Sequence, residues 1–292
     1  MAIMKKTVVT MIMLVCLTIV VGHAESGMKM LTAEAGARAT AMGGAFTSIT
    51  ADPYSAAYNP AGTWGVTDVT GSVGHNTYWE NTRIETGYLS FHKHSTIFTA
   101  GVQFASVDDL EGRVGPTDDF YEFGAHEVSI KIGAAFQLEP KYILGFSLGW
   151  MYEKIDVEEG SAINFDLGLL MQPYPNLNIG LAVLNFGSTI SLRDEDYDLP
   201  RTYRAGISYT FRDFTPSADI VYLDDEAYVH LGGEYKLYNQ FFIRSGYRVG
   251  YDTKDFSAGA GFVRRNFRLD YAYLPFKSGL NDSHLINLTF DI

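Results

Sequence analysis

From about residue 68 to the C-terminus, the chain repeats windows of about ten residues in which apolar and polar side chains alternate. A period of two puts successive side chains on opposite faces of a β-strand, so each window predicts a strand. The final window is the clearest, with one apolar and one polar set: Ile286, Leu288, Phe290 and Ile292 against Asn287, Thr289 and Asp291. We count fourteen such windows. An even number returns an antiparallel chain to the side on which it began.

The connections between the windows alternate in length and in charge. Short ones such as 92–96 and 137–141 carry basic residues, whereas long ones such as 105–126 and 185–201 are acidic. Outer-membrane barrels combine short periplasmic turns with long extracellular loops in this way. The acidic loops offer a place for cations or basic partners, although solvation is the usual role of such charge runs.

Alternation alone also fits a secreted β-sandwich or β-helix. In those folds the apolar side chains point inward and the charged ones outward, whereas in a membrane barrel the directions are reversed. The alternating connections favour the membrane barrel. The last strand also ends at the last residue, with Phe290 and Ile292 on its apolar face, which resembles the C-terminal signal that barrel-assembly machinery uses. We therefore predict an all-β fold, a 14-stranded antiparallel transmembrane β-barrel over residues 67–292, surrounded by the lipid bilayer of the cell outer membrane.

Residues 1–24 have the pattern of a cleaved signal peptide. Lys5 and Lys6 precede an apolar run over residues 7–21, and small residues close the segment at Ala24. The run is shorter than the roughly 20 residues of a spanning helix, which favours cleavage over an uncleaved anchor. Cys16, the single cysteine of the chain, lies in this run, so the exported protein would have no disulfide and no thiol chemistry.

Residues 25–66 differ from both neighbours, because they are rich in small and turn-forming residues. Asp52-Pro53 predicts the N-cap and first residue of a short helix, and Asn59-Pro60 predicts its end. A barrel of fourteen strands is wide enough to leave a lumen. We expect this N-terminal segment, held before the first strand on the periplasmic side, to fill that lumen as a hatch with short helices.

The N-terminal segment resembles the PorV/PorQ branch of the FadL-like outer-membrane proteins. The resemblance rests on Arg38, Met42 to Phe46, Asp52, Ala56-Ala57 and Asn59-Pro60-Ala61, and on Asp270 to Phe276 near the last hairpin. It implies a hatch that includes Arg38, Gly43, Gly44, Asp52, Asn59 and Pro60. It further implies binding or passage of small hydrophobic molecules through the plugged lumen. The alternative that it implies is a component of type IX protein secretion, which would shuttle or attach secreted cargo proteins.

Polar residues on the inward faces of the strands are the candidate lumen-facing residues. They are Asn164, Asp166, Arg204, Asp219, His230, Glu234, Arg244, Arg248, Arg268 and Asp270. Buried charges need partners, so these side chains are expected to bond one another and the hatch backbone, with Arg38 and Asp52 as the hatch residues that pair with the wall. The functional alternative is that some of them form a passage, or a latch that releases the hatch.

Composition and spacing exclude several other functions. A formal net charge of −12 argues against nucleic acid as a partner, because phosphate binding needs clustered Lys and Arg. His92 and His94 lie two apart in a turn with no third ligand in view. Ser283 and His284 begin a strand without the spacing of a catalytic triad. We expect no enzyme activity, no metal and no cofactor.

Overall fold

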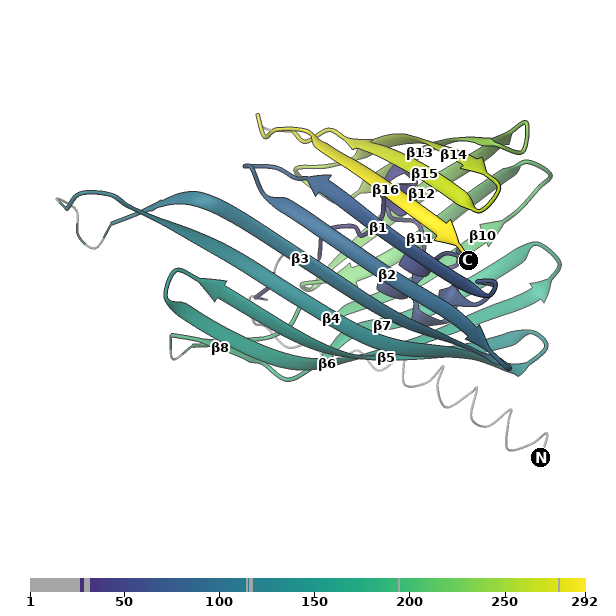
Figure 1. Ribbon diagram of the computed structural model, residues 1–292, viewed down its shortest axis with the longest axis horizontal. Coiled ribbons are helices and arrows are strands. Elements are labelled where there is room, and N and C mark those ends of the chain that lie inside the picture. The colour runs from purple at the N-terminus through teal and green to yellow at the C-terminus, as the bar shows by residue number, and fades with distance from the viewer. Residues whose placement is uncertain (1–26, 29–31, 114, 116–117, 194, 278) are drawn as a thin grey trace.

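The computed structural model describes residues 27–28, 32–113, 115, 118–193, 195–277 and 279–292. The predicted signal peptide, residues 1–24, lies outside these described residues. The described chain forms a closed antiparallel barrel of fourteen strands, in which the first strand pairs with the last (Figure 1). The 14-stranded antiparallel barrel predicted from the alternation is therefore confirmed.

The barrel strands follow one another around the wall in chain order. They are β1 (Val69–Thr77), β2 (Arg83–Lys93), β3 (Thr96–Gly112), β4 (Tyr121–Glu139), β5 (Tyr142–Ile155), β6 (Glu158–Tyr174), β7 (Leu177–Gly187), β10 (Thr202–Tyr209), β11 (Phe214–Leu223), β12 (Glu226–Leu237), β13 (Phe241–Val249), β14 (Phe256–Arg264), β15 (Phe267–Leu274) and β16 (Ser283–Asp291). Two further strands, β8 (Ile190–Leu192) and β9 (Glu195–Tyr197), form a small separate sheet in the connection between β7 and β10.

The outer face of the barrel is apolar, whereas the inner face carries polar and small side chains, with larger apolar ones where it meets the N-terminal segment. Ile132, Phe146 and Trp150 point outward and are 60%, 47% and 44% exposed, whereas Ser147, between two of them in sequence, is buried. Soluble monomers rarely expose contiguous apolar patches of more than a few hundred Å². A continuous apolar band around a closed barrel is the lipid-facing surface of a membrane barrel.

The prediction of a long loop over residues 105–126 is wrong in its extent. The strands β3 and β4 continue through most of it and project beyond the other strands, leaving only residues 113–120 as their connection (Figure 1). Main-chain pairing continues there although the alternation stops, with a register shift between Val107 and Leu110 and a positive φ of 59° at Asp109. A β-bulge of this kind interrupts the period-two pattern without ending the ladder, so the sequence pattern missed the extension.

The N-terminal segment lies inside the barrel and forms short helices: α2 (Ala37–Ala41), η2 (Pro53–Ala57) and η3 (Pro60–Thr63). Asp52 accepts a hydrogen bond from Tyr54 N, and Asn59 accepts one from Ala61 N. Each side chain thereby satisfies an amide that the helix start leaves unpaired, and each is followed by a proline that has no amide to lose. Asn59-Pro60 thus ends one short helix and begins the next.

No helix among the described residues is long and apolar enough to cross a membrane.

The described residues of the N-terminal segment contact the wall near both ends of the barrel. At the end with the long hairpins, Gly27 N donates to Asp198 O, and Met28 packs against Met151 and Ile190. At the end with the short turns, Ala61 and Val66 pack among Ile97, Ala135, Ile143 and Leu170. Small side chains allow such a segment to lie against the wall over this whole length.

Glycines in the wall make room for the backbone of the N-terminal segment. A Cβ at Gly145 in β5 would overlap the backbone of Pro60 and Ala61. The fit is reciprocal at Gly43, where φ is +67° and a Cβ would lie 2.8 Å from Leu231 O. Glycine is needed here for two reasons: the left-handed backbone conformation disfavours other residues, and the strand backbone leaves no room for a Cβ.

Substitution of Gly145 should loosen the N-terminal segment while the barrel stays closed. Gly145→Ala should lower the free energy of local unfolding of residues 32–66 by about 1–3 kcal/mol, the usual cost of overpacking. Hydrogen exchange followed by mass spectrometry measures this. Gly71→Ala is the matched control, because the nearest atom to a Cβ there is Leu89 Cδ1 at 3.8 Å. Equal exchange in the two variants would contradict the packing argument.

Candidate functional site

Arg38 in α2 joins the N-terminal segment to the barrel wall. Its Nε and Nη2 atoms donate to Oε2 and Oε1 of Glu234 in β12, at 2.8 and 2.7 Å. Arg244 in β13 donates from Nε to the same Glu234 at 2.6 Å, and from Nη1 to Asp270 Oδ1 at 2.8 Å. Two-point pairing of a guanidinium with a carboxylate fixes orientation as well as distance.

Asp52 makes the second link of the same cluster. Its Oδ2 accepts from Arg268 Nη2 at 2.7 Å and from Arg38 Nη1 at 3.3 Å. Arg268 Nε in turn lies 2.8 Å from Asp270 Oδ2. Burial raises the pKa of Asp52, but the neighbouring Arg268 and Arg38 lower it by more, so that this pKa lies below its ordinary value of 3.8.

These six side chains form one network, which we call the latch cluster. It consists of Arg38, Asp52, Glu234, Arg244, Arg268 and Asp270. Three guanidinium groups face three carboxylates, so the cluster is neutral as a whole. Two members come from the N-terminal segment and four from strands β12, β13 and β15. The structure therefore brings together six of the residues that the sequence had singled out, whereas the others lie elsewhere on the wall and the N-terminal segment.

A second group of contacts holds the turn after α2, where Gly43 and Gly44 have positive φ. Asp219 in β11 accepts from Phe46 N at 2.9 Å, and from Thr47 N and Oγ1 at 3.0 and 2.6 Å. Arg204 in β10 donates to Gly44 O at 2.6 Å and to Asp219 at 3.1 Å. The wall thus adds hydrogen bonds to the main chain of this turn, where Phe46 N also donates to Gly44 O at 3.0 Å.

The predicted hatch residues Asn59 and Pro60 lie against the opposite wall. Asn59 Nδ2 donates to Thr47 O at 2.9 Å and to Leu169 O in β6 at 3.2 Å. Pro60 is buried and begins η3, which packs on β4, β5 and β6. The Asn59 side chain therefore caps a helix, crosses to an earlier turn and reaches the wall.

Glu34 is a buried contact that the sequence pattern did not reveal. Its Oε1 accepts from Arg248 Nε at 2.8 Å, and its Oε2 lies 3.3 Å from Lys254 Nζ. Its side chain is 7% exposed. Burial raises the pKa of Glu34, but the positive charges of Arg248 and Lys254 together lower it by more. This pKa therefore falls well below its ordinary value of 4.5. No cap, turn or alternation marks this position in the sequence.

Lys131 in β4 was also missed, although the alternation places it inward. Its Nζ donates to both oxygens of Asp166, at 3.0 and 2.7 Å, and to Asn185 Oδ1 at 2.8 Å. The Asn164 amide lies beside that of Asn185. The predicted residues Asn164 and Asp166 thus belong to a wall cluster apart from the latch cluster. The signal was present in the sequence, because Lys131 lies between the outward-facing Ile130 and Ile132 and must therefore point inward.

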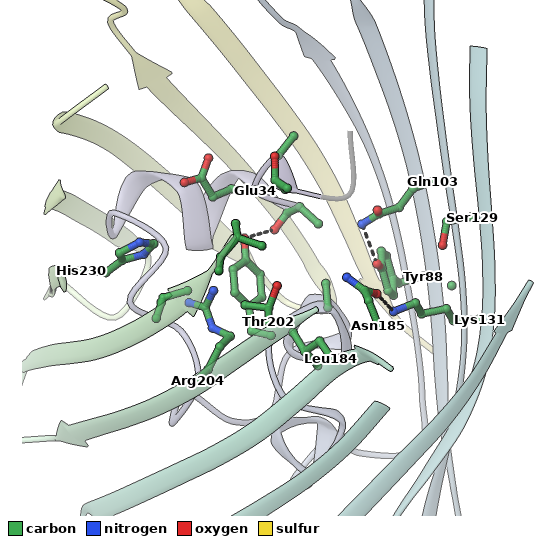
Figure 2. A pocket seen from close by; sticks show the side chains of 18 of the residues that line it. Glu34, Tyr88, Gln103, Ser129, Lys131, Leu184, Asn185, Thr202, Arg204 and His230 are labelled. Atoms are coloured by element: carbon green, nitrogen blue, oxygen red, sulfur yellow. Dashed lines mark hydrogen bonds between the residues drawn. The ribbon is translucent and has the colours of Figure 1, made fainter. Parts of the chain in front are cut away.

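A small cavity remains between the N-terminal segment and the wall. Figure 2 shows Glu34, Arg204 and His230 on one side of it, and Tyr88, Gln103 and Lys131 on the other. Its volume is about 70 Å³, which is room for a few water molecules. Apolar Leu184 and the ring of Tyr58 also face it. Within the described residues, no group of three or more His, Cys, Asp or Glu side chains is arranged to hold a metal ion.

A closed antiparallel barrel with a lipid-facing exterior and a chain segment in its lumen defines a plugged transmembrane barrel. No family model and no curated protein matches this chain. Among solved structures, the CymD monoaromatic hydrocarbon channel aligns with a TM-score of 0.66 at 13% identity, over 88% of this chain and 97% of that one. The TodX deltaS2S3 mutant monoaromatic hydrocarbon channel gives 0.64 and 13% over the same shares.

A third solved structure, a FadL homologue of Pseudomonas aeruginosa, aligns with a TM-score of 0.60 at 11% identity, over 86% of this chain and 96% of that one. At such low identities these likenesses establish the shared fold: this chain has the barrel architecture of FadL-like channels.

Removing the charge of Glu234 should release the N-terminal segment. Glu234→Gln leaves Arg38 and Arg244 buried without their shared counter-charge, a loss of about 3–5 kcal/mol. Hydrogen exchange in residues 32–66 should then accelerate about a hundredfold or more. Glu85→Gln is the control, because the His75–Glu85 pair is about half exposed and worth at most about 1 kcal/mol. A similar effect of both substitutions would contradict the role of the latch cluster.

Acid should loosen the N-terminal segment only below about pH 4.5. The pKa of Glu34 is lowered in the folded state, so its stabilising contribution is complete above the ordinary value of 4.5 and declines as the pH falls further. Asp52 adds a loss of the same sign below 3.8. Trp64 fluorescence in a Trp79→Phe, Trp150→Phe background reports this transition. Glu34→Gln should weaken the pH dependence, and an unchanged acid transition in that variant would contradict the assignment.

Proposed function

We propose that this protein is a FadL-like channel of the outer membrane that passes small hydrophobic molecules when its N-terminal segment, acting as a hatch, moves. The observation that carries the proposal is the latch cluster, in which six charged groups join that segment to three strands of the wall. A buried network of this kind holds the N-terminal segment strongly in one position. It also becomes fully hydrated once the segment leaves and water enters the lumen.

The cavity supports movement of the hatch as a condition for passage. Its volume of about 70 Å³ holds water but is too small for an aromatic ring with its surrounding contacts, for which cavities of about 150 Å³ are needed. The lumen therefore passes a hydrocarbon only after the N-terminal segment has shifted. This structure represents the closed state of the proposed channel.

The substrate class follows from the fold and from the cavity lining. Hydrocarbon channels share this architecture, and rings and aliphatic side chains (Tyr58, Tyr88 and Leu184) face the cavity beside polar groups. Ligand pockets combine an apolar lining with a few fixed polar groups in this way. We infer a small hydrophobic molecule, oriented during passage by the polar groups of the wall.

Membership of the PorV/PorQ branch, cleavage after residue 24 and insertion by barrel-assembly machinery belong to the same proposal. The first rests on the sequence of the N-terminal segment, which includes Asn59-Pro60-Ala61, and the second on the apolar run that precedes it. The boundaries 25–66 for the hatch and 67–292 for the barrel are proposed on the same grounds. N-terminal sequencing of the mature protein tests the cleavage site.

A role in protein secretion is the alternative that the family resemblance implies. It rests on that resemblance and on the acidic loops alone. Affinity purification from outer membranes tests it: recovery of secreted proteins that share a C-terminal domain would favour secretion over small-molecule passage.

Locking the N-terminal segment to the wall should block passage. Ala41 and Ala272 pack in one buried cluster, and Cys16, the single cysteine, lies in the predicted signal peptide. The double variant Ala41→Cys, Ala272→Cys should take up radiolabelled toluene at least about tenfold more slowly when oxidised than when reduced, if the hatch must move by more than a disulfide allows. Cells without other hydrocarbon channels provide the background for this uptake assay.

Each single-cysteine variant controls for the substitutions themselves, and non-reducing gels of proteolytic fragments confirm the cross-link. Unchanged uptake through a fully cross-linked barrel would contradict the proposed movement.

A further inference from the structure

Three polar side chains on the outer face of β1 and β2 form a hydrogen-bonded chain outside the lumen. Glu85 Oε1 lies 2.7 Å from His75 Nδ1, and His75 Nε2 lies 3.3 Å from Thr77 Oγ1. A carboxylate only accepts hydrogen bonds, so in the neutral imidazole the proton is on Nδ1. Nε2 then accepts the hydrogen bond of the Thr77 hydroxyl. This order of hydroxyl, imidazole and carboxylate is that of a catalytic triad, and we call the three residues the rim triad.

The strand register holds the rim triad together. His75 is paired with Glu85 directly across the β1–β2 ladder, and Thr77 is the next residue after His75 on the same face. Side chains in these two relations are neighbours on a sheet. The side chains of His75 and Glu85 are 48% and 52% exposed, so a substrate can reach them. The triad was not evident from the sequence, because it exists only when β1 and β2 pair in this register.

Two hydrogen-bond donors flank Thr77 on the same face. Arg83 is its partner across the β1–β2 ladder, and His284 is its partner across the seam between β1 and β16. Arg83 donates from Nη2 to Asp108 at 2.6 Å, which uses one of its five N–H groups. His284 Nδ1 lies 2.8 Å from the hydroxyl of Tyr271, which leaves Nε2 as a second donor. Donors so placed stabilise the negative oxygen that forms when a hydroxyl attacks an ester.

The position of the rim triad on the barrel indicates its substrate class. Strand β1 ends at Thr77, at the end of the barrel with the long hairpins (Figure 1). On the same face, Val73 and Ile286 belong to the apolar band and are 58% and 48% exposed, and the exposed ring of Trp79 follows the triad. Aromatic side chains mark the level at which a barrel meets the membrane–water interface. The ester groups of membrane lipids lie in this interfacial layer, between the headgroups and the hydrocarbon.

We propose that the rim triad hydrolyses carboxylic esters of membrane lipids on the outer surface of the barrel. Thr77 Oγ1 attacks the carbonyl carbon of the ester while its proton passes to His75 Nε2. Arg83 and His284 donate to the resulting oxyanion. The bond from the carbonyl carbon to the alcohol oxygen then breaks, and His75 gives the proton to the leaving alcohol. A water molecule, deprotonated by His75, attacks the acyl-threonine, releases the fatty acid and restores the Thr77 hydroxyl.

Glu85 is a positioning residue in this scheme. It fixes the orientation and tautomer of the His75 imidazole and stabilises its positive charge, without touching the substrate. Because the rim triad lies on the outer face, the proposal does not depend on hatch movement or on the lumen. Its test therefore succeeds or fails separately from that of the proposed channel function.

The full-length barrel, reconstituted in vesicles of diacyl phosphatidylcholine, tests the proposal. Mass spectrometry measures the initial release of fatty acid and lysophosphatidylcholine, which should appear in equal amounts and above the level of protein-free vesicles. Thr77→Val removes the hydroxyl at nearly the same volume. Thr77→Val and His75→Gln should each lower the rate at least about a hundredfold, because nucleophile and base act as a unit. The Thr77→Val preparation also reveals any lipase carried over from the host.

Conservative variants separate the chemistry from a structural role. Thr77→Ser keeps a nucleophilic hydroxyl and should retain the rate within about threefold. Glu85→Gln should lower kcat at least about tenfold at an unchanged KM, because the residue orients the base and does not bind the lipid. His126→Gln in β4, a histidine whose ring lies near those of Phe104 and Tyr152, should leave the rate unchanged. Heat-dependent gel mobility verifies that each barrel is folded.

Either of two results would overturn the proposal. The first is release of fatty acid by the folded wild-type barrel that does not exceed that of protein-free vesicles. The second is release at the same rate by the wild type, Thr77→Val and His75→Gln, which would assign the activity to another site or to a contaminant.

Discussion

The structure depends on one constraint, which is that charges enclosed in the barrel lumen must meet opposite charges. The wall contributes two arginines and two carboxylates to the latch cluster, and the N-terminal segment contributes one of each. Buried ion pairs add little net stability compared with a well-packed apolar core, but displacing one partner is expensive. The cluster therefore determines where the N-terminal segment sits more than how stable the barrel is. It also suits a gate, because its charged side chains become hydrated when the segment leaves. An apolar lumen would instead expose apolar surface to water, which costs free energy.

The barrel itself could be predicted from sequence because lipid and lumen impose opposite requirements on adjacent residues. Phe146 and Trp150 point to lipid, and Ser147 between them points inward. Repetition of that contrast over fourteen windows determined the strand number. The pattern failed where this contrast ends. Beyond the apolar band, both faces of β3 and β4 meet water, so a bulge at Asp109 and an extended hairpin leave no alternation to detect.

The candidate site could be predicted only in part, because alternation gives the direction of a side chain but not its partner. Arg244 and Asp270 were expected to face inward, yet nothing in the sequence shows that Arg244 would bridge Glu234 and Asp270. Glu34 lies in irregular chain before α2, where no period applies, and its contacts with Arg248 and Lys254 span more than 200 residues. Such pairings depend on where the N-terminal segment rests in three dimensions.

Asn287 in β16 gives the N-terminal segment a part in building the wall. Its Oδ1 accepts from Ala37 N at 2.5 Å, and its Nδ2 donates to the hydroxyl of Tyr54, which also bonds Thr86 in β2 at 2.8 Å. These contacts meet at the seam where β16 pairs with β1 and closes the barrel. Sliding β16 by one residue would turn Asn287 toward lipid and break all of its contacts with the segment. The contacts of the segment with Asn287 are therefore compatible only with the register that β16 has in the closed barrel.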